Sequence, residues 1–460
     1  MVQKTNRRYL FTAVCAGNLA AMSAGIVSTW TSPVFPKLNN ETQLANNPLG
    51  YVINTQEESW VGSMLALGAV FGPLLAGFSA ETIGRKYALL LVCGIPFLVS
   101  FVTLSFAKTI YVYYFARFVG GMAMGGVYTV LPMFNCEIAE DSIRGGVSSS
   151  MNVFVTSGQL LSYLVGPYLS IMWFSLVCSI IPSLFIIFFF FVPESPYFLI
   201  GKERVEHAEK SLQKFRMDSS PLIKEELNNI RLNVEDDKNR EGSSLDIIKS
   251  KALLKALFIV FSLMFVQQAC GINAFLTYSE SIFGSTGSSI SPVLSSIIIG
   301  IVQLLASIVT PLIVDKFGRK KMFFISAVGM MIAEIPLGFY FYLKANKSEI
   351  LNDLFWLPVA CLIIFFICYN LGYGPLPWTV MGEIFPSNVK SAASTASAVV
   401  CWVLGFLVVK LFSTISEGVG LAGTYWILAG CCFIGVLFSW FVLIETKGKT
   451  FQEIQESLNN

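Results

Sequence analysis

The sequence is poor in charge and nearly devoid of histidine. Only 13% of its 460 residues are charged, about half the share that is usual in soluble globular proteins. The deficit excludes an ordinary soluble domain. His207 is the single histidine, so a histidine-based triad or metal site is excluded as well. The sequence shows no nucleophile–base pair and no spacing of metal ligands, and we therefore expect neither an enzyme nor a bound cofactor.

A disulfide framework is also missing, although the chain has ten cysteines. Nine of them lie inside apolar runs, and Cys136 lies at the end of one. None falls in a predicted outer loop. Small buried hydrophobic side chains explain these positions better than disulfide bridges.

What the chain has instead is apolar sequence, with 54% hydrophobic residues. It is arranged in twelve runs, each long enough to cross a bilayer as a helix. Backbone groups in lipid must be hydrogen-bonded internally, so the runs predict helices and an all-α membrane protein. The predicted spans are 10–32, 58–79, 88–107, 111–134, 147–168, 171–192, 254–276, 293–314, 322–343, 354–376, 391–413 and 421–443.

The lysines and arginines predict the orientation of the spans. With the N-terminus inside, most of the 31 basic residues fall in cytoplasmic segments, as membrane proteins prefer. The glycosylation sequons at Asn40 and Asn346 then both lie in outer loops. We expect both termini to be cytoplasmic, and the sequons favour the plasma membrane.

One long polar stretch divides the twelve spans into two sets of six. We predict an N-terminal six-helix bundle over 1–192 and a cytoplasmic linker with short amphipathic helices over 193–253. A C-terminal six-helix bundle follows over 254–443, and a cytoplasmic tail over 444–460. The linker either is simply solvated or docks beneath the two bundles.

The two sets of spans carry the same motifs in the same order, which indicates a duplication. Gly84-Arg85-Lys86 follows the second span and Gly318-Arg319-Lys320 the eighth. Opposite charges at inner helix ends can pair when that side is closed and must separate when it opens, which biases a two-state equilibrium. Anchoring of the helix ends is the alternative role. The predicted inner-gate network comprises Glu81, Arg85, Glu137, Arg144, Glu194, Asp315, Arg319, Glu383, Lys390 and Glu445.

Six motifs together resemble the sugar porter branch of the major facilitator superfamily, and within it the insect facilitative hexose and trehalose carriers. They are Gly77…Glu81…Gly84-Arg85-Lys86, Glu137…Arg144-Gly145, Pro193-Glu194-Ser195-Pro196, Gln267-Gln268…Gly271-Ile272-Asn273, Gly374-Pro375-Leu376-Pro377-Trp378 and Glu445-Thr446-Lys447-Gly448. The resemblance implies the major facilitator fold, with two bundles that rock around a central sugar site.

The chain departs from the family pattern at several positions. Glu81 stands where an Asp is usual, Lys390 where an Arg is usual, and Ile444 where a Pro is usual. In the pocket, Cys401 stands in place of an Asn and Asn370 in place of a Glu. The pocket changes leave the identity of the sugar open.

Three amides in the seventh span are the first candidates for binding sugar. Gln267, Gln268 and Asn273 are polar at membrane depth, which is costly without a use. An amide both donates and accepts hydrogen bonds, as a sugar hydroxyl does, and Gly271 lets the helix loosen between them. The resemblance implies that these positions bind sugar. The alternative is hydrogen bonding between helices without a ligand.

Other pocket candidates come from the resemblance and from side-chain chemistry. An indole offers a flat apolar face and one donor, which suits Trp378 and Trp402. Pro375 and Pro377 predict a hinge in the tenth span beside Trp378. The remaining candidates are Gln303, Tyr163, Gln159, Tyr278 (as an outer cover) and Asn370.

Uncharged binding groups suit a neutral solute that must leave again. We therefore predict a facilitative uniporter for a hexose, with glucose as the expected sugar. Its other partner is the lipid bilayer, and one subunit is expected to be sufficient for transport. The first span has no acidic residue, which favours uniport over proton coupling. Trehalose transport, proton symport and a non-transporting sensor remain alternatives, the last disfavoured by a short tail. Glu334 in the ninth span is either a proton site or a carboxylate that pairs with a helix end or faces a polar groove.

Overall fold

The protein is all-helical across the residues that the computed structural model describes. The described residues are 7–41, 47–140, 143–217, 221–239, 250–287, 290–385, 387–447 and 451–459. The first half of the chain forms α1 (Arg8–Thr29), α2 (Thr31–Leu38), α3 (Thr55–Thr82), α4 (Arg85–Ala88), η2 (Leu89–Gly94), α5 (Ile95–Ser105), α6 (Ile110–Ile138), α7 (Arg144–Val165), η3 (Gly166–Tyr168) and α8 (Ile171–Phe190).

Short helices and then a second set of long ones follow. The connecting helices are α9 (Pro196–Gly201), α10 (Val205–Arg216) and α11 (Pro221–Asn239). The second half forms α13 (Lys251–Ala269), α14 (Ile272–Thr286), α15 (Pro292–Phe317), α16 (Arg319–Ala345), η4 (Glu349–Asn352), α17 (Leu357–Leu371), α18 (Leu376–Ile384), α19 (Ser387–Phe441) and α20 (Phe451–Asn459).

The long helices make twelve membrane spans. Nine helical segments among the described residues are long and apolar enough to cross a membrane. One of them, within α19, turns at Gly420, where φ is 74°, and so provides two spans. The helices α6 and α7 also have the length of spans. The predicted twelve-span fold is confirmed.

Two spans are broken in mid-course, at positions where the sequence predicts loosening. The seventh span stops at Ala269 and resumes as α14 after Gly271, whose φ of 83° lies in the left-handed region that glycine tolerates best. The tenth span stops at Leu371 and resumes at Leu376 as α18. Broken helices expose backbone carbonyls, so they are tolerated in membranes only where protein or a cavity covers them.

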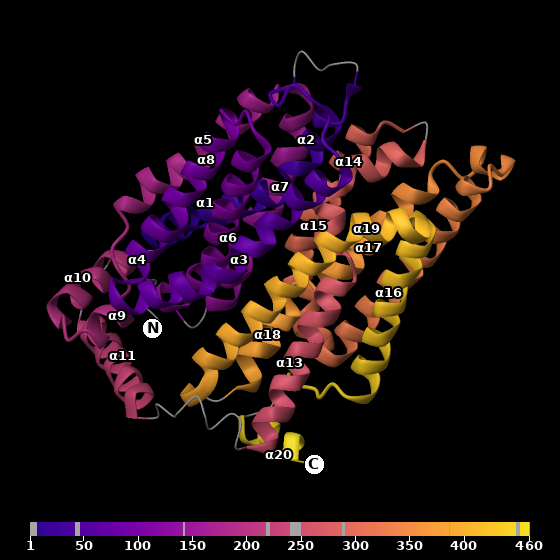
Figure 1. Cartoon of the computed structure of the whole chain (residues 1–460). Helices are drawn as coiled ribbons and strands as arrows, with labels where there is room; N and C mark the ends of the chain where they lie inside the picture. Colours follow the sequence, from indigo (N-terminus) through magenta and orange to yellow (C-terminus); the bar gives the residue numbers. More distant parts are fainter. Residues whose placement is uncertain are drawn as a thin grey trace.

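The two halves stand side by side in Figure 1, the first drawn from indigo to magenta and the second from rose through orange to yellow. We call the end that carries the Gly84–Lys86 and Gly318–Lys320 loops the basic end, and the other the opposite end. The helices α9, α10 and α11 lie at the basic end of the first half (Figure 1) and share a small core built on residues such as Leu212, Ile223 and Ile230.

Contacts between the halves reach the opposite end. There α2 packs on α14, and α3 packs along α19. The backbone N–H of Glu280 donates to Ser32 Oγ at 3.1 Å, and Ser59 Oγ donates to the carbonyl of Lys410 at 2.8 Å. Further in, α7 packs on α15, where the hydroxyls of Thr156 and Ser307 lie 3.0 Å apart.

Candidate functional site

The charge cluster of the first half is built around Gly84. Arg85 donates to both carboxylate oxygens of Glu137, from Nε at 3.1 Å and from Nη2 at 3.0 Å. Glu194 accepts the backbone N–H of Lys86 at 3.1 Å, so its charge sits where the next helix begins, a position favoured by the helix dipole. Gly84 has φ 108°, and an added Cβ would lie 2.2 Å from Glu194 Oε2. Only glycine leaves room for that carboxylate.

The second half repeats this cluster with other residues. Arg319 Nη2 donates to Glu383 at 2.9 Å, as Arg85 does to Glu137. Glu445 accepts the backbone N–H groups of Arg319 at 2.9 Å and Lys320 at 3.1 Å. Gly318 has φ 86°, and an added Cβ would lie 2.7 Å from Glu445 Oε2. The motif repeat seen in the sequence is therefore a repeat of three-dimensional contacts.

These ion pairs form within each half. Arg85 pairs with Glu137 in the first half and Arg319 with Glu383 in the second, and the side chain of Glu81 is exposed. The side chains of Asp315 and Lys390 lie outside the described residues. The sequence did not point to Arg7–Glu140 (2.5 Å) or Arg216–Glu226 (2.6 Å), two pairs that no motif marks.

The predicted amides meet at the two helix breaks. Gln267 Nε2 donates to the carbonyls of Tyr373 and Gly374, both at 2.9 Å, and so ties the break of the seventh span to that of the tenth. Gln268 Nε2 donates to Cys401 Sγ at 3.0 Å, and its oxygen accepts from Asn273 Nδ2. In this structure the amides are hydrogen-bonded to protein groups, so a solute hydroxyl would have to exchange with these bonds. Asn273 is only half-buried and keeps an accessible side.

Other predicted binding residues hold unused hydrogen-bonding atoms. Gln159 Oε1, Gln303 Nε2 and Trp402 Nε1 are buried, and none has a partner among the described residues. Gln159 comes from α7, Gln303 from α15 and Trp402 from α19, so both halves contribute. Buried polar atoms are nearly always paired in proteins. These three atoms are accordingly available to a ligand with hydroxyl groups.

The contact between α7 and α15 places Tyr163. A Cβ added to Gly300 of α15 would lie 3.0 Å from the Tyr163 ring, so this buried ring packs closely on the second half. Asn370 is different: its Nδ2 donates to the carbonyl of Phe366 at 2.9 Å within the same helix. That donor is therefore already used.

Aromatic rings form the boundary of the site. Tyr278 of α14 stacks between Phe35 of α2, at 5.5 Å, and Phe412 of α19, at 5.6 Å. This stack lies toward the opposite end, where the sequence predicts that Tyr278 covers the site. Deeper in, Trp378 and Trp402 both contact Tyr128 of α6. No motif marks Tyr128; the available signal was one large ring two residues after the Gly125-Gly126 pair in a span.

Glu334 of α16 stands apart from this site. It is fully buried, and neither carboxylate oxygen has a hydrogen-bond partner among the described residues. Cys432 and Tyr425 of α19 lie beside it, and Cys270 lies nearby. Its role as a proton site stays a prediction. The alternative, that Glu334 pairs with a helix end or faces a polar groove, stays a prediction as well.

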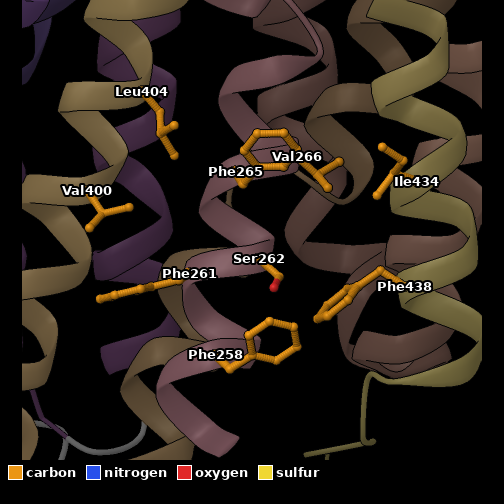
Figure 2. A pocket seen from close by; sticks show the side chains of 9 residues that line it. All are labelled: Phe258, Phe261, Ser262, Phe265, Val266, Val400, Leu404, Ile434 and Phe438. Carbon is orange, nitrogen blue, oxygen red and sulfur yellow. The ribbon is translucent and has the colours of Figure 1, made fainter. Parts of the chain in front are cut away.

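A groove of about 400 Å³ opens between α13 and the two arms of α19. Figure 2 shows its walls, with Phe258, Phe261 and Phe265 on α13 and Ile434 and Phe438 facing them. Ser262 supplies its only polar side chain. Because Phe258, Phe265 and Ile434 are exposed on the apolar flank of spanning helices, the groove faces lipid. A sugar, which needs several hydrogen-bonding partners, does not belong there.

Twelve spans in two halves with repeated charge clusters, and uncharged polar groups at paired helix breaks, define a membrane transporter with the major facilitator fold. Residues 15–458 match the family described as "Sugar (and other) transporter". The chain belongs to this family, the sugar porters, and is a sugar transporter rather than an enzyme.

Relatives and solved structures are similar over nearly the whole chain. A facilitated trehalose transporter of Bombyx mori is 32% identical over 99% of this chain and 88% of its own length. The one of Anopheles gambiae is also 32% identical, but this chain spans 57% of it, and about half of several others. The proton:xylose symporter XylE bound to 6-bromo-6-deoxy-D-glucose has a TM-score of 0.78 at 24% identity, covering 98% of this chain and 99% of that one. That likeness shows the fold.

Proposed function

We propose that the protein is a facilitative uniporter for a neutral hexose, with glucose as the first substrate to test. The observation that carries this proposal is the meeting of Gln268 and Asn273 with α19 at Cys401 and Gly405, next in sequence to Trp402, whose indole N–H has no partner among the described residues. Amide and indole groups can exchange hydrogen bonds with sugar hydroxyls. A carrier must also release its substrate, and a Kd of about 1 mM corresponds to only about −4 kcal/mol.

Transport proceeds by alternating access in this proposal, with the basic end in the cytoplasm. The stack of Phe35, Tyr278 and Phe412 closes the opposite end. At the basic end, the ion pairs of Arg85 and Arg319 stay within their own halves. Such an arrangement suits an inward-facing state, from which the halves would tilt about the contact of α7 with α15.

Uniport is supported by the first span, because α1 contains no Asp or Glu. A proton-coupled carrier needs a titratable group that both faces the pathway and responds to the substrate. Proton symport remains the second candidate mechanism, since a solved structure of similar fold is that of a proton:xylose symporter. Trehalose remains the second candidate substrate, because the relatives above are facilitated trehalose transporters.

Uptake by the purified protein in proteoliposomes tests the proposal. We expect saturable glucose uptake without a pH gradient, and the same initial rate when a gradient is imposed. Gln268→Ala should raise the KM for glucose about tenfold, because it removes both a donor and an acceptor from the site. Gln213→Ala in the connecting helix α10 is the matched control and should leave uptake unchanged.

Two results would contradict different parts of the proposal. Uptake that requires a proton gradient would reject uniport while keeping the substrate. Saturable trehalose uptake without glucose uptake would reject the hexose and keep the carrier.

A further inference from the structure

One ring from the first half lies against two rings from the second at the centre of the molecule. The Tyr128 ring of α6 is 6.4 Å from that of Trp378, with 21° between their planes. It is 5.8 Å from the ring of Trp402, at 58°. Tyr128 therefore covers part of both indoles that the sequence marks as sugar platforms.

The cluster borders the amide site and has accessible space beside it. Tyr128 lies near Cys401, whose thiol is hydrogen-bonded to Gln268. Tyr128 and Trp378 are only half-buried although they stand in the interior of the bundle. Trp402 is 6% exposed, and its indole N–H has no partner among the described residues. Rings that are partly exposed in the middle of a protein border a space that a solute can enter.

We propose that Tyr128 is a specificity-determining residue that limits the site to one pyranose ring. This proposal rests on the proposed function. A hexose can stack its C–H face on the uncovered part of an indole while its hydroxyls reach Gln268 and Asn273. The second ring of a disaccharide has to occupy the volume that the Tyr128 phenol fills. The backbone of α6 cannot retreat easily, because Gly121 and Gly125 hold it against the carbonyls of Leu65 and Ala69 at distances that admit no Cβ.

The alternative role for Tyr128 is packing alone, as an aromatic contact that holds the halves together. Truncation would then lower transport of every sugar in the same proportion. Size selection instead predicts a change in the ratio of two substrates, which a general loss of stability or of active protein does not produce.

The test compares glucose and trehalose uptake by Tyr128→Ala and the unaltered protein in proteoliposomes. We expect the trehalose-to-glucose ratio of kcat/KM to rise about tenfold in Y128A, a size typical of changes in pocket volume. Tyr128→Phe keeps the ring and should keep the ratio. Tyr111→Ala, an exposed tyrosine on the same helix, is the matched control and should leave both uptakes unchanged.

An unchanged ratio in folded Y128A, or an equal rise in Y128F, would overturn the proposal. So would efficient trehalose uptake by the unaltered protein alongside glucose uptake. Absence of glucose uptake by the unaltered protein would instead reject the proposed function. If Y128A does not fold, Tyr128→Val removes most of the volume of the ring while keeping an apolar side chain, and the same ratio decides.

Discussion

The charge clusters of the two halves have the same plan but differ in how firmly they are built. Arg85 holds both oxygens of Glu137, and the two side chains are 16% and 14% exposed. Arg319 donates from Nη2 to Glu383, whose side chain is 29% exposed. Thr446 donates a hydroxyl to the other oxygen of Glu383 at 2.6 Å.

This difference between the charge clusters indicates that the two halves differ in rigidity. The first cluster is a two-point ion pair beneath which α9 also lies, with Phe198 against the Arg85 guanidinium at 5.3 Å. The second cluster depends on Glu445 and Thr446, which follow the last span. Both broken spans belong to the second half. We infer that the first half is the stiffer platform and that the second contains the elements that rearrange.

The largest loss of stability expected from this comparison follows from replacing Gly84 or Gly318. Gly84→Ala places a Cβ 2.2 Å from Glu194 Oε2, and Gly318→Ala places one 2.7 Å from Glu445 Oε2. Both also force alanine to a positive φ, at a cost of about 1–3 kcal/mol. We expect both substitutions to lower the midpoint of thermal unfolding in detergent. The decrease should be larger for G84A than for G318A, because the cluster around Gly84 is the more rigid and can move less to make room for the Cβ. Gly145→Ala, with nothing within 4 Å of the added Cβ, is the control. Equal midpoints for G84A and G145A would contradict the role of Gly84.

Replacing Arg85 or Arg319 should also destabilise the first cluster more than the second, but by a smaller amount. Arg85→Ala leaves a largely buried carboxylate without its two-point partner, at a cost of about 2 kcal/mol. Arg319→Ala should cost about 1 kcal/mol, because Glu383 is more exposed and keeps the Thr446 hydroxyl. Denaturant unfolding in detergent measures both. Arg231→Ala, which breaks an exposed pair, should change stability by less than about 0.5 kcal/mol. A loss for R319A that exceeds that for R85A would reverse the proposed order of stiffness.

The sequence predicts the fold well because a lipid bilayer permits few backbone structures. Long apolar runs must be helices, and the paired motifs around Gly84 and Gly318 predict two matching clusters. Partners within those clusters are harder to predict, since a charge at a helix end can pair within its half or across to the other. The sequence also predicts which amides face the centre, but not that Gln268 and Asn273 bond to one another. Tyr128 has no motif, and only its contacts with two distant tryptophans reveal it.

The smallest expected effect concerns the two acceptor glutamates, which should respond to pH in opposite directions. Burial raises the pKa of Glu194 above its ordinary value, and the N–H groups of Ser195 and Lys86 only partly offset this. Partial burial also acts to raise the pKa of Glu445. The N–H groups of Lys447, Arg319 and Lys320 outweigh it, so this pKa is lowered. Glutamate in an unfolded chain titrates at about 4.3.

The sign of each contribution to stability follows from linkage. Glu445 stabilises the folded protein above the unfolded pKa, and this contribution is lost as pH falls through its lowered folded value. The contribution of Glu194 is fully present below the unfolded pKa and is lost as pH rises through its raised folded value. Glu445→Gln should therefore lower the unfolding midpoint at pH 7 by about 2 °C, and the deficit should shrink as the pH falls below about 4. Glu194→Gln should show the reverse trend, with its larger deficit in acid. Parallel pH profiles for the two variants would mean that the two halves hold their acceptor carboxylates in equivalent surroundings.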